Sequence, residues 1–365
     1  MRILILNWRD IKHSWAGGSE LYIHELAKRW VKLGSEVTLF CAQDIVQPLP
    51  DKEVIDGITI FRKGGKFSVY FWAFIYYFKY FRNKTDVILD VENGIPFFTP
   101  FYSRKKKVCL VYHVHGKQFF YELPFPISIL GYVLEKYVFP LLYRNINIMA
   151  ISKSTKRELE RLGFKSKRIS IVEPGVSING SKILSVSKYN KPTVVYLGRI
   201  KKYKRIEILV NIMPKILEKI PNARLLIAGW GSEAPFIIDL AMKSKVRKRI
   251  ELIGPVSEYE KKILLSKSWI FVNPSLHEGW GISVIETNLM GTPAIGFNVP
   301  GLSDSIKNGY NGYLCGDEEA MIGAIVKVLE NKKLRENLSK NSKKWAHQFN
   351  WDNAAKLSLR MIKKT

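Results

Sequence analysis

The chain has 365 residues, with 58 Lys and Arg against 32 Asp and Glu, and a formal net charge of +26. This length exceeds what one hydrophobic core fills, so we expect two domains. The content of 47% hydrophobic and 25% charged residues excludes a mostly disordered chain. Three separated cysteines without CxxC spacing indicate neither a disulfide framework nor a zinc site, and they favour a cytoplasmic protein.

The first half alternates short apolar runs with amphipathic stretches, which is typical of parallel strands joined by helices. We expect strands at residues 3–7, 36–42, 86–91, 107–115 and 146–152, and helices at 19–33 and 153–162. The first residues, MRILILNWRD, have no extended apolar region and no cleavage site, so they indicate a buried strand and not a signal peptide.

Two segments in this half are rich in aromatic residues. Residues 67–81 read FSVYFWAFIYYFKYF, which is shorter than the roughly 20 apolar residues of a membrane-spanning helix. Burial in the first domain and contact with a membrane surface are equal alternatives for it, and also for residues 119–143, which prolines interrupt. With the basic run at 104–107, these segments suggest an anionic membrane surface as a partner and a peripheral location on the inner face of the membrane.

A polar connector at residues 177–191 separates a second series of strands, expected at 193–198, 223–229, 250–254, 269–274 and 293–297. The fold class is therefore α/β, with Rossmann-like domains at 1–178 and 190–365. A final helical pattern covers residues 345–362. It either completes the second domain or packs back on the first.

The string HEGWGISVIE at 277–286 holds two glutamates, Glu278 and Glu286, just after an expected strand. Parallel sheets place ligands at the carboxyl ends of their strands. Gly279 and Gly281 permit close approach of a ligand, and the helix that follows offers N–H groups to an anion. The alternative is a capping box in which Ser283 and Glu286 only satisfy the helix start.

The same string resembles the two-glutamate signature of the large retaining glycosyltransferase family four, which has the GT-B fold. The resemblance implies two Rossmann-like domains facing a central cleft, with the first domain binding the acceptor and the second the nucleotide sugar. In that family the first glutamate lies near the donor sugar and the second binds the ribose hydroxyls. The donor-binding residues implied here are Glu278, Gly279, Gly281, Ile282 and Glu286, with Trp280 in place of the more usual phenylalanine.

Further strings extend the resemblance over nearly the whole chain. LGRIKKYKRIEIL from Leu197 matches the family's arginine and lysine, here Arg199 and Lys204, which contact the donor diphosphate in the family. Gly198 and Gly229, the latter in AGWGSE, belong to the same donor site by resemblance. In isolation, a solvated basic turn is an equally good interpretation of Arg199 and Lys204.

In the first domain, AGGSE contains Gly17 and Gly18, which match the family's N-terminal glycine loop. His115 precedes Gly116 in VYHVHG, where the family carries a histidine facing the anomeric carbon. His113 is the second choice, because strand alternation would place both histidines on one face. FNVPGLSDSI departs from the family pattern, since Pro300, Gly301 and Asp304 stand where two glycines and a glutamate are usual.

The resemblance implies transfer of a hexose from a UDP- or GDP-linked sugar to a lipid-linked or glycan acceptor, with retention of configuration. The residues expected to act in catalysis are His115, Arg199, Lys204 and Glu278. The chain has no DxD sequence, so we expect no metal ion and no cofactor besides the nucleotide-sugar substrate. A nucleotide-sugar epimerase or hydrolase, and a non-catalytic nucleotide- or glycan-binding protein, are the alternatives. No nucleic-acid-binding signature accompanies the charge, and we expect no such partner.

Overall fold

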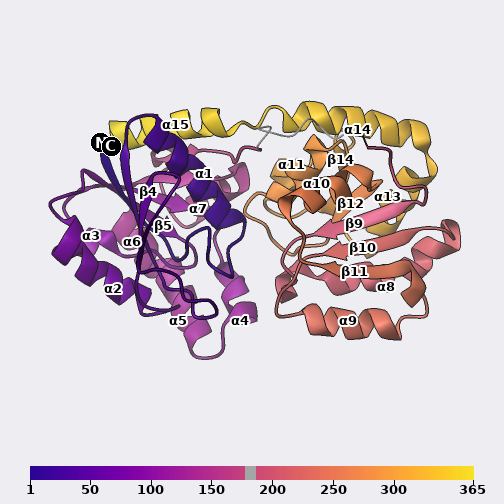
Figure 1. Cartoon of the computed structure of the whole chain (residues 1–365), viewed down its shortest axis with the longest axis horizontal. Coiled ribbons are helices and arrows are strands. Elements are labelled where there is room, and N and C mark those ends of the chain that lie inside the picture. Colours follow the sequence, from indigo (N-terminus) through magenta and orange to yellow (C-terminus); the bar gives the residue numbers. More distant parts are fainter. Residues whose placement is uncertain (177–185) are drawn as a thin grey trace. The chain divides into compact units, whose positions relative to one another are not determined.

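The structure is a computed structural model that describes residues 1–176 and 186–365 and divides into two compact units (Figure 1). Unit 1 comprises Met1–Gly175 and Asn350–Thr365, and unit 2 comprises Val176–Phe349. The domains expected from the sequence, 1–178 and 190–365, differ from these units mainly in the C-terminal segment, which belongs to unit 1. The connector expected at 177–191 lies in part outside the described residues.

Unit 1 is built on an eight-stranded sheet with the order β3-β4-β2-β1-β5-β6-β7-β8. All neighbouring strands are parallel except β3 and β4. The strands are β1 (Arg2–Leu6), β2 (Glu36–Cys41), β3 (Lys52–Ile55), β4 (Ile58–Arg62), β5 (Val87–Glu92), β6 (Lys106–Val111), β7 (Asn147–Ala150) and β8 (Ile169–Ile171). The helical elements are α1 (Gly18–Lys32), α2 (Val69–Tyr76), η1 (Tyr77–Phe81), α3 (Thr99–Tyr102), η2 (Gly116–Gln118), α4 (Phe119–Glu122), α5 (Ile127–Val133), η3 (Leu134–Val138), α6 (Phe139–Tyr143), α7 (Lys153–Arg161), η4 (Ser166–Arg168) and α15 (Trp351–Lys364).

The antiparallel hairpin of β3 and β4 is an element that our sequence analysis missed. Asp56 and Gly57 form its two-residue turn, and both have positive φ, of 50° and 79°. A tight hairpin turn of this kind requires left-handed backbone at both positions, which Asp-Gly pairs adopt readily. The Asp-Gly pair between two apolar runs is therefore the signal that identifies this hairpin.

Strand β6 is shorter than predicted, since it ends at Val111 and not at residue 115. Its neighbours end at the same level: Glu92 of β5 and Ala150 of β7 both lie opposite Val111. Residues 112–115 therefore have no strand to pair with, and His113 and His115 lie in the loop that follows. The strand-alternation argument for their side chains was wrong.

The aromatic segment at 67–81 forms α2 and the π-helical turn η1, and its two faces differ. Val69, Ala73, Tyr77 and Phe81 recur every four residues and are buried against a core that includes Phe40 of β2. The exposed aromatic side chains of the segment are Phe67, Phe71, Phe74, Phe78 and Tyr80. The segment is therefore buried on one face, and aromatic rings elsewhere on it are exposed. Within the described residues, every helix is too short or too polar to cross a bilayer.

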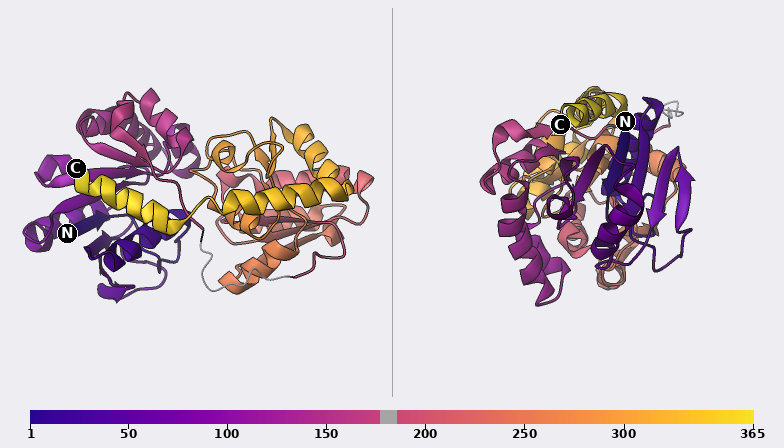
Figure 2. Two further views of the ribbon diagram at one scale, coloured as in Figure 1. Left: turned by 90° about the horizontal axis from the view of Figure 1, so that it is seen from above. Right: turned by 90° about the vertical axis from the view of Figure 1, so that its left-hand side faces the viewer.

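The predicted C-terminal helix is two helices. In unit 2, α14 (Lys332–Ala346) ends before Asn350, whose side chain accepts hydrogen bonds from the first N–H groups of α15. In unit 1, α15 packs along α1, as Figure 2 shows from above. The buried Trp30 of α1 donates its indole N–H to Ala355 O at 3.2 Å and to Ser358 Oγ at 3.1 Å. This is the arrangement in which the last helix packs back on the first domain.

Unit 2 is built on a six-stranded parallel sheet with the order β11-β10-β9-β12-β13-β14. Its core joins apolar side chains of β9, β10, β12 and β13 to those of α8, α9 and α13. The strands are β9 (Thr193–Leu197), β10 (Arg224–Ala228), β11 (Ile250–Gly254), β12 (Ile270–Asn273), β13 (Ala294–Phe297) and β14 (Gly312–Cys315). With α14, the helices are η5 (Lys202–Lys204), α8 (Ile206–Lys219), α9 (Ala234–Lys243), η6 (Arg247–Arg249), α10 (Glu258–Lys267), α11 (Ile282–Leu289), α12 (Leu302–Ser305) and α13 (Glu318–Glu330).

Candidate functional site

The predicted donor-site residues of unit 2 lie beyond the carboxyl ends of neighbouring strands. Strand β9 is followed by Arg199 and Lys204, and strand β12 by Glu278. Strands β9 and β12 are neighbours although two strands of the sheet, β10 and β11, separate them in sequence, and both of these lie on the other side of β9. The order of strands thus reverses between β9 and β12. This switch point is where open α/β sheets bind their ligands.

Lys204 and Glu278 meet at the switch point. The ammonium of Lys204 donates to Glu278 Oε1 at 2.5 Å, and the same oxygen accepts from Asn273 Nδ2 at 3.0 Å and Ser275 Oγ at 2.8 Å. Burial alone would raise the pKa of Glu278 and lower the pKa of Lys204. Their mutual attraction outweighs burial, so the pKa of Glu278 is lowered and that of Lys204 raised. Both groups are charged at neutral pH.

The glycines around Glu278 are required by close backbone approach. A Cβ on Gly301 would lie 2.1 Å from the carbonyl oxygen of Glu278, and the N–H of Glu278 donates to Pro300 O at 3.2 Å. The departure from the family pattern at residues 300–304 therefore keeps a glycine where the loop packs on Glu278. Gly281 has φ of +82° and precedes the first residue of α11, Ile282.

The capping-box alternative for Ser283 and Glu286 is wrong. The N-cap of α11 is Gly281, so no side chain caps the start of the helix, and Ser283 lies inside the helix. The carboxylate of Glu286 instead accepts from Lys261 Nζ of α10 at 2.8 Å. Lys261 also donates to Glu258 at 2.8 Å. Burial would lower the pKa of Lys261, but the two carboxylates raise it.

The turns after β9 and β10 are packed together through glycine. A Cβ on Gly229 would lie 1.9 Å from the carbonyl oxygen of Gly198, and the Gly198 N–H donates to Ala228 O at 3.1 Å. Both glycines have positive φ, which is 153° at Gly198 and 133° at Gly229. Only glycine fits this approach, which brings the backbone before Arg199 next to the turn after β10.

In unit 1, Gly17 and Gly18 lie at the start of α1, where Gly17 is the N-cap. The N–H of Gly17 donates to the buried carboxylate of Glu20 at 2.8 Å. The other oxygen of Glu20 accepts from the guanidinium of Arg9, with Nη2 at 3.1 Å. The Glu20 carboxylate thus accepts the first N–H of the glycine loop, and its ion pair with Arg9 connects the loop to the residues that follow β1.

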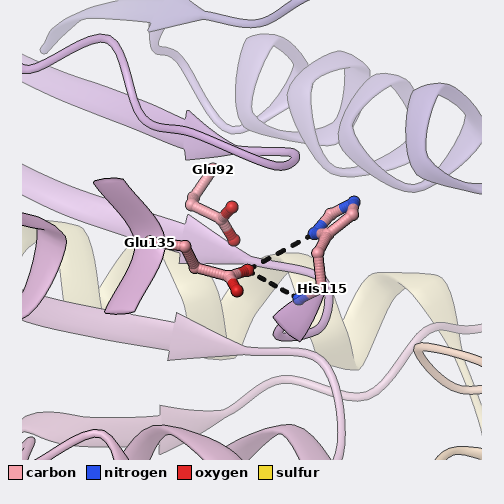
Figure 3. Close-up of side chains that lie close together, drawn as sticks. All are labelled: Glu92, His115 and Glu135. Atoms are coloured by element: carbon pink, nitrogen blue, oxygen red, sulfur yellow. Dashed lines mark hydrogen bonds and ion pairs between the residues drawn. The ribbon is translucent and has the colours of Figure 1, made fainter. Parts of the chain in front are cut away.

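His115 lies in a buried group with two carboxylates, shown in Figure 3. Glu92 is the last residue of β5, and Glu135 comes from η3. One ligand-type atom from each of the three side chains lies within 4.8 Å of the other two. The rings of His113 and His115 stack with centroids 4.1 Å apart, so the two candidates do lie together, although not on a strand.

Sequence reasoning missed Lys261, Glu92 and Glu135. Glu92 is the first charged residue after the apolar end of an expected strand, and Glu135 is one of only two acids, with Glu122, in the largely apolar segment 119–143. An acid in an otherwise apolar helix is a usable signal, because it is rarely buried without a partner. Lys261 stands in a helix rich in charge and gives no such signal.

Comparisons with known proteins identify related families over most of the chain. The family described as "Glycosyltransferase Family 4" matches residues 16–179, and the family described as "Glycosyl transferases group 1" matches residues 184–345. An uncharacterized glycosyltransferase of Methanocaldococcus jannaschii is 25% identical over all of this chain and 98% of its own length.

Two solved structures share the fold over the whole chain. Sucrose-phosphate synthase of Thermosynechococcus elongatus is 20% identical with a TM-score of 0.81, covering 100% of this chain and 98% of that one. HepE of Anabaena, solved with UDP and glucose, is 14% identical with a TM-score of 0.77 and full coverage of both chains. The two family matches together span most of the sequence. The chain is therefore a glycosyltransferase of the group 1 and family 4 type, with the GT-B fold.

Proposed function

We propose that this enzyme transfers a hexose from a UDP- or GDP-linked sugar to a lipid-linked or glycan acceptor, with retention of configuration and without a divalent metal ion. The observation that carries the proposal is the Lys204–Glu278 pair at the switch point of the unit 2 sheet. A buried cation held by a carboxylate at the carboxyl ends of parallel strands suits an anionic ligand.

The leaving nucleotide diphosphate is the anion that this position fits. Arg199 and Lys204 supply positive charge, and the start of α11 carries no side-chain cap, so its first N–H groups are open to a phosphate. Charge that develops on the departing diphosphate is stabilised by such preorganised donors. Because two cations supply this charge, the reaction needs no metal ion on the diphosphate.

Glu286 is proposed as the anchor of the nucleotide ribose. Its Oε1 accepts a hydrogen bond from Lys261 Nζ at 2.8 Å, which fixes the direction of the carboxylate. An ionised carboxylate accepts from two neighbouring hydroxyl groups, which is the pattern that a ribose offers. HepE, which shares the fold, was solved with UDP and glucose, and this supports a uridine donor among the two nucleotides considered.

Retention follows if the leaving phosphate removes the acceptor proton on the same face of the sugar. The protein then has two tasks, which are to orient donor and acceptor and to stabilise the departing charge. Glu278 would lie beside the donor sugar, and His115 would face the anomeric carbon from unit 1. A separate general base is not needed in this reaction.

The experiment offers a panel of UDP- and GDP-sugars and measures nucleotide release with and without a lipid extract. We expect one donor to be consumed only when acceptor is present, and activity to survive EDTA. Glu286→Ala should raise KM for that donor by at least about tenfold, the scale of a lost charged hydrogen bond.

Donor consumption without acceptor would indicate a hydrolase. Loss of transfer in EDTA with recovery in Mg²⁺ or Mn²⁺ would contradict metal independence.

The acceptor side of the proposal is a peripheral contact with an anionic membrane. The exposed face of α2 and η1 carries a row of aromatic rings, and Lys66, Lys79 and Arg82 flank them. Aromatic and basic residues on one helix face are typical of segments that lie in a membrane interface. The net charge of +26 adds long-range attraction to anionic lipid.

Flotation with vesicles tests this contact. We expect the chain to float with vesicles that contain phosphatidylserine at low salt, and to be released as salt rises. The double substitution Phe71→Ser and Phe78→Ser should reduce flotation severalfold. Phe236→Ser is the matched control, because Phe236 is 52% exposed on α9 of unit 2. Equal flotation of all three proteins would contradict the proposed surface.

A further inference from the structure

His115, Glu92 and Glu135 form a buried cluster at the carboxyl ends of β5 and β6 in unit 1 (Figure 3). Glu92 is 1% exposed, and Glu135 is 2% exposed. Two buried carboxylates beside a half-buried imidazole are costly unless their charges balance. The contacts of each group show how this balance is reached.

Glu135 holds the backbone that carries His115. Its Oε1 accepts from the N–H of His115 at 2.6 Å, and its Oε2 accepts from the N–H of Gly116 at 2.7 Å. These two N–H groups stand at the start of η2, where Gly116 has φ of +49°. A carboxylate that accepts two backbone hydrogen bonds fixes the peptide orientation at both residues.

The imidazole ring is held on both sides. His113 stacks on it with centroids 4.1 Å apart and an interplanar angle of 29°, and Phe119 stacks with centroids 5.2 Å apart and an angle of 25°. Nδ1 of His115 lies 3.6 Å from Glu135 Oε1. Figure 3 shows the other ring nitrogen, Nε2, on the side of the ring away from both carboxylates.

Glu92 completes the charge balance. Its Oε1 accepts from the Gly94 N–H at 2.8 Å, while its Oε2 is buried without a hydrogen-bond partner. Burial raises the pKa of Glu92 to about 8, with Glu135 adding to the effect and His115 opposing it. The raised pKa of Glu92 favours its neutral form, which reduces the buried negative charge around His115.

We propose that Glu135 is a positioning residue for His115. Its carboxylate fixes the backbone at residues 115 and 116 and lies beside Nδ1, so that the imidazole is held with Nε2 turned away from both carboxylates and available to the donor. This inference rests on the proposed role of His115 in the transfer reaction.

The titratable groups that face the ring come from four elements or loops. They are Glu92 at the end of β5, His113 in the loop after β6, Glu122 of α4 and Glu135 of η3. Burial lowers the pKa of His115, but the three carboxylates raise it above its ordinary value, with Glu135 first among them. A raised pKa means that the protonated form persists to higher pH than in a free imidazole and is lost as pH rises through the shifted value.

The test combines Glu135→Gln with NMR titration of His115, whose signal is assigned with His115→Asn. We expect the His115 titration in Glu135→Gln to move to lower pH by about one unit or more, as expected when an opposite charge within about 4–6 Å is removed. The limb of the kcat profile that falls with rising pH should move in the same direction. At neutral pH, kcat should fall at least tenfold while KM for the donor changes little.

Three further variants sharpen the result. Glu135→Asp keeps the charge and should keep the raised titration while losing kcat, and it serves if the Gln variant does not fold. Glu122→Gln is the comparison variant, because Glu122 is exposed and its carboxylate accepts from Gln118 Nε2 at 2.7 Å. Glu122 comes last among the carboxylates that raise the His115 pKa, so this variant should move both profiles less than Glu135→Gln does. In Glu92→Gln, a second, smaller step near pH 8 in the His115 titration should disappear.

Several outcomes would overturn the proposal. One is a folded Glu135→Gln protein whose His115 titration and pH profile match the unchanged enzyme. Another is a purified chain that carries a stoichiometric divalent metal which Glu92→Gln abolishes, because a cation would then balance the cluster. If the titration moves but no nucleotide sugar is turned over by any protein, the positioning stands and the proposed function fails.

Discussion

Lys204 and Glu278 stabilise each other in a buried pair, so removing the lysine should affect both stability and activity. Lys204→Met leaves the Glu278 carboxylate buried without its cation, and we expect the free energy of unfolding at pH 7 to fall by about 3–5 kcal/mol. If Lys204 contacts the diphosphate, kcat should fall by about 10². Urea unfolding and nucleotide-release assays measure the two effects.

The pH dependence of this loss has a definite sign. The folded-state pKa of Glu278 is lowered, so its contribution to stability is present above the unfolded pKa of about 4.3 and is lost as pH falls through the folded value. The stability difference between the two proteins should therefore shrink in acid. Lys215→Met, which removes an exposed partner of Glu319, is the control and should change little at either pH. An equal loss in both variants would contradict the role of the buried pair.

What the sequence reveals at this scale depends on whether partners are close along the chain. Glu278, Gly281 and Glu286 fall in one string, and the string alone indicated a turn between a strand and a helix near a ligand. Glu135 contacts the backbone of residue 115 from another helix, and Lys261 reaches Glu286 from α10. No spacing rule predicts such contacts, because they arise from tertiary packing.

Helix α2 and the turn η1 allow a prediction at the scale of an element. Ala73 is fully buried in the middle of the apolar face, whereas Phe71 is 62% exposed on the other. Ala73→Asp places a charge in the core, and we expect it to lower the free energy of unfolding by roughly 2–7 kcal/mol. Phe71→Asp, two residues away, should change it by less than about 1 kcal/mol. Chemical denaturation of the two variants measures this contrast, and similar losses would mean that the faces are not as described.

Elements were predicted well where apolar runs are bounded by polar residues, as in β1, β2 and β9. The predicted strand at 107–115 was too long because VYHVHG continues the alternating pattern after β5 and β7 have ended. The hairpin of β3 and β4 was missed although the Asp56-Gly57 pair indicates its turn. Which face of α2 packs on the sheet could not be read from the sequence, because nearly every position of the segment is apolar.

At the scale of the whole molecule, each unit has its own sheet and its own hydrophobic core. The proposed nucleotide contacts from Arg199, Lys204 and Glu286 all lie in unit 2. A ligand that binds only the folded state adds stability to the unit that holds it, about 2.7 kcal/mol at 100 times its Kd. Nucleotide binding should therefore change hydrogen exchange unequally in the two units.

We expect UDP or GDP to slow backbone exchange most strongly at residues 198–204 and 278–286, with a smaller effect at the glycine loop around residue 17. The reason is that the first two segments carry the groups proposed to hold the diphosphate and ribose, whereas the N–H of Gly17 is already bonded to Glu20. Hydrogen exchange with mass spectrometry measures this, and Glu286→Ala at the same nucleotide concentration should lose most of the protection in unit 2. Protection confined to unit 1 would contradict the assignment of the nucleotide to unit 2, whichever sugar the donor carries.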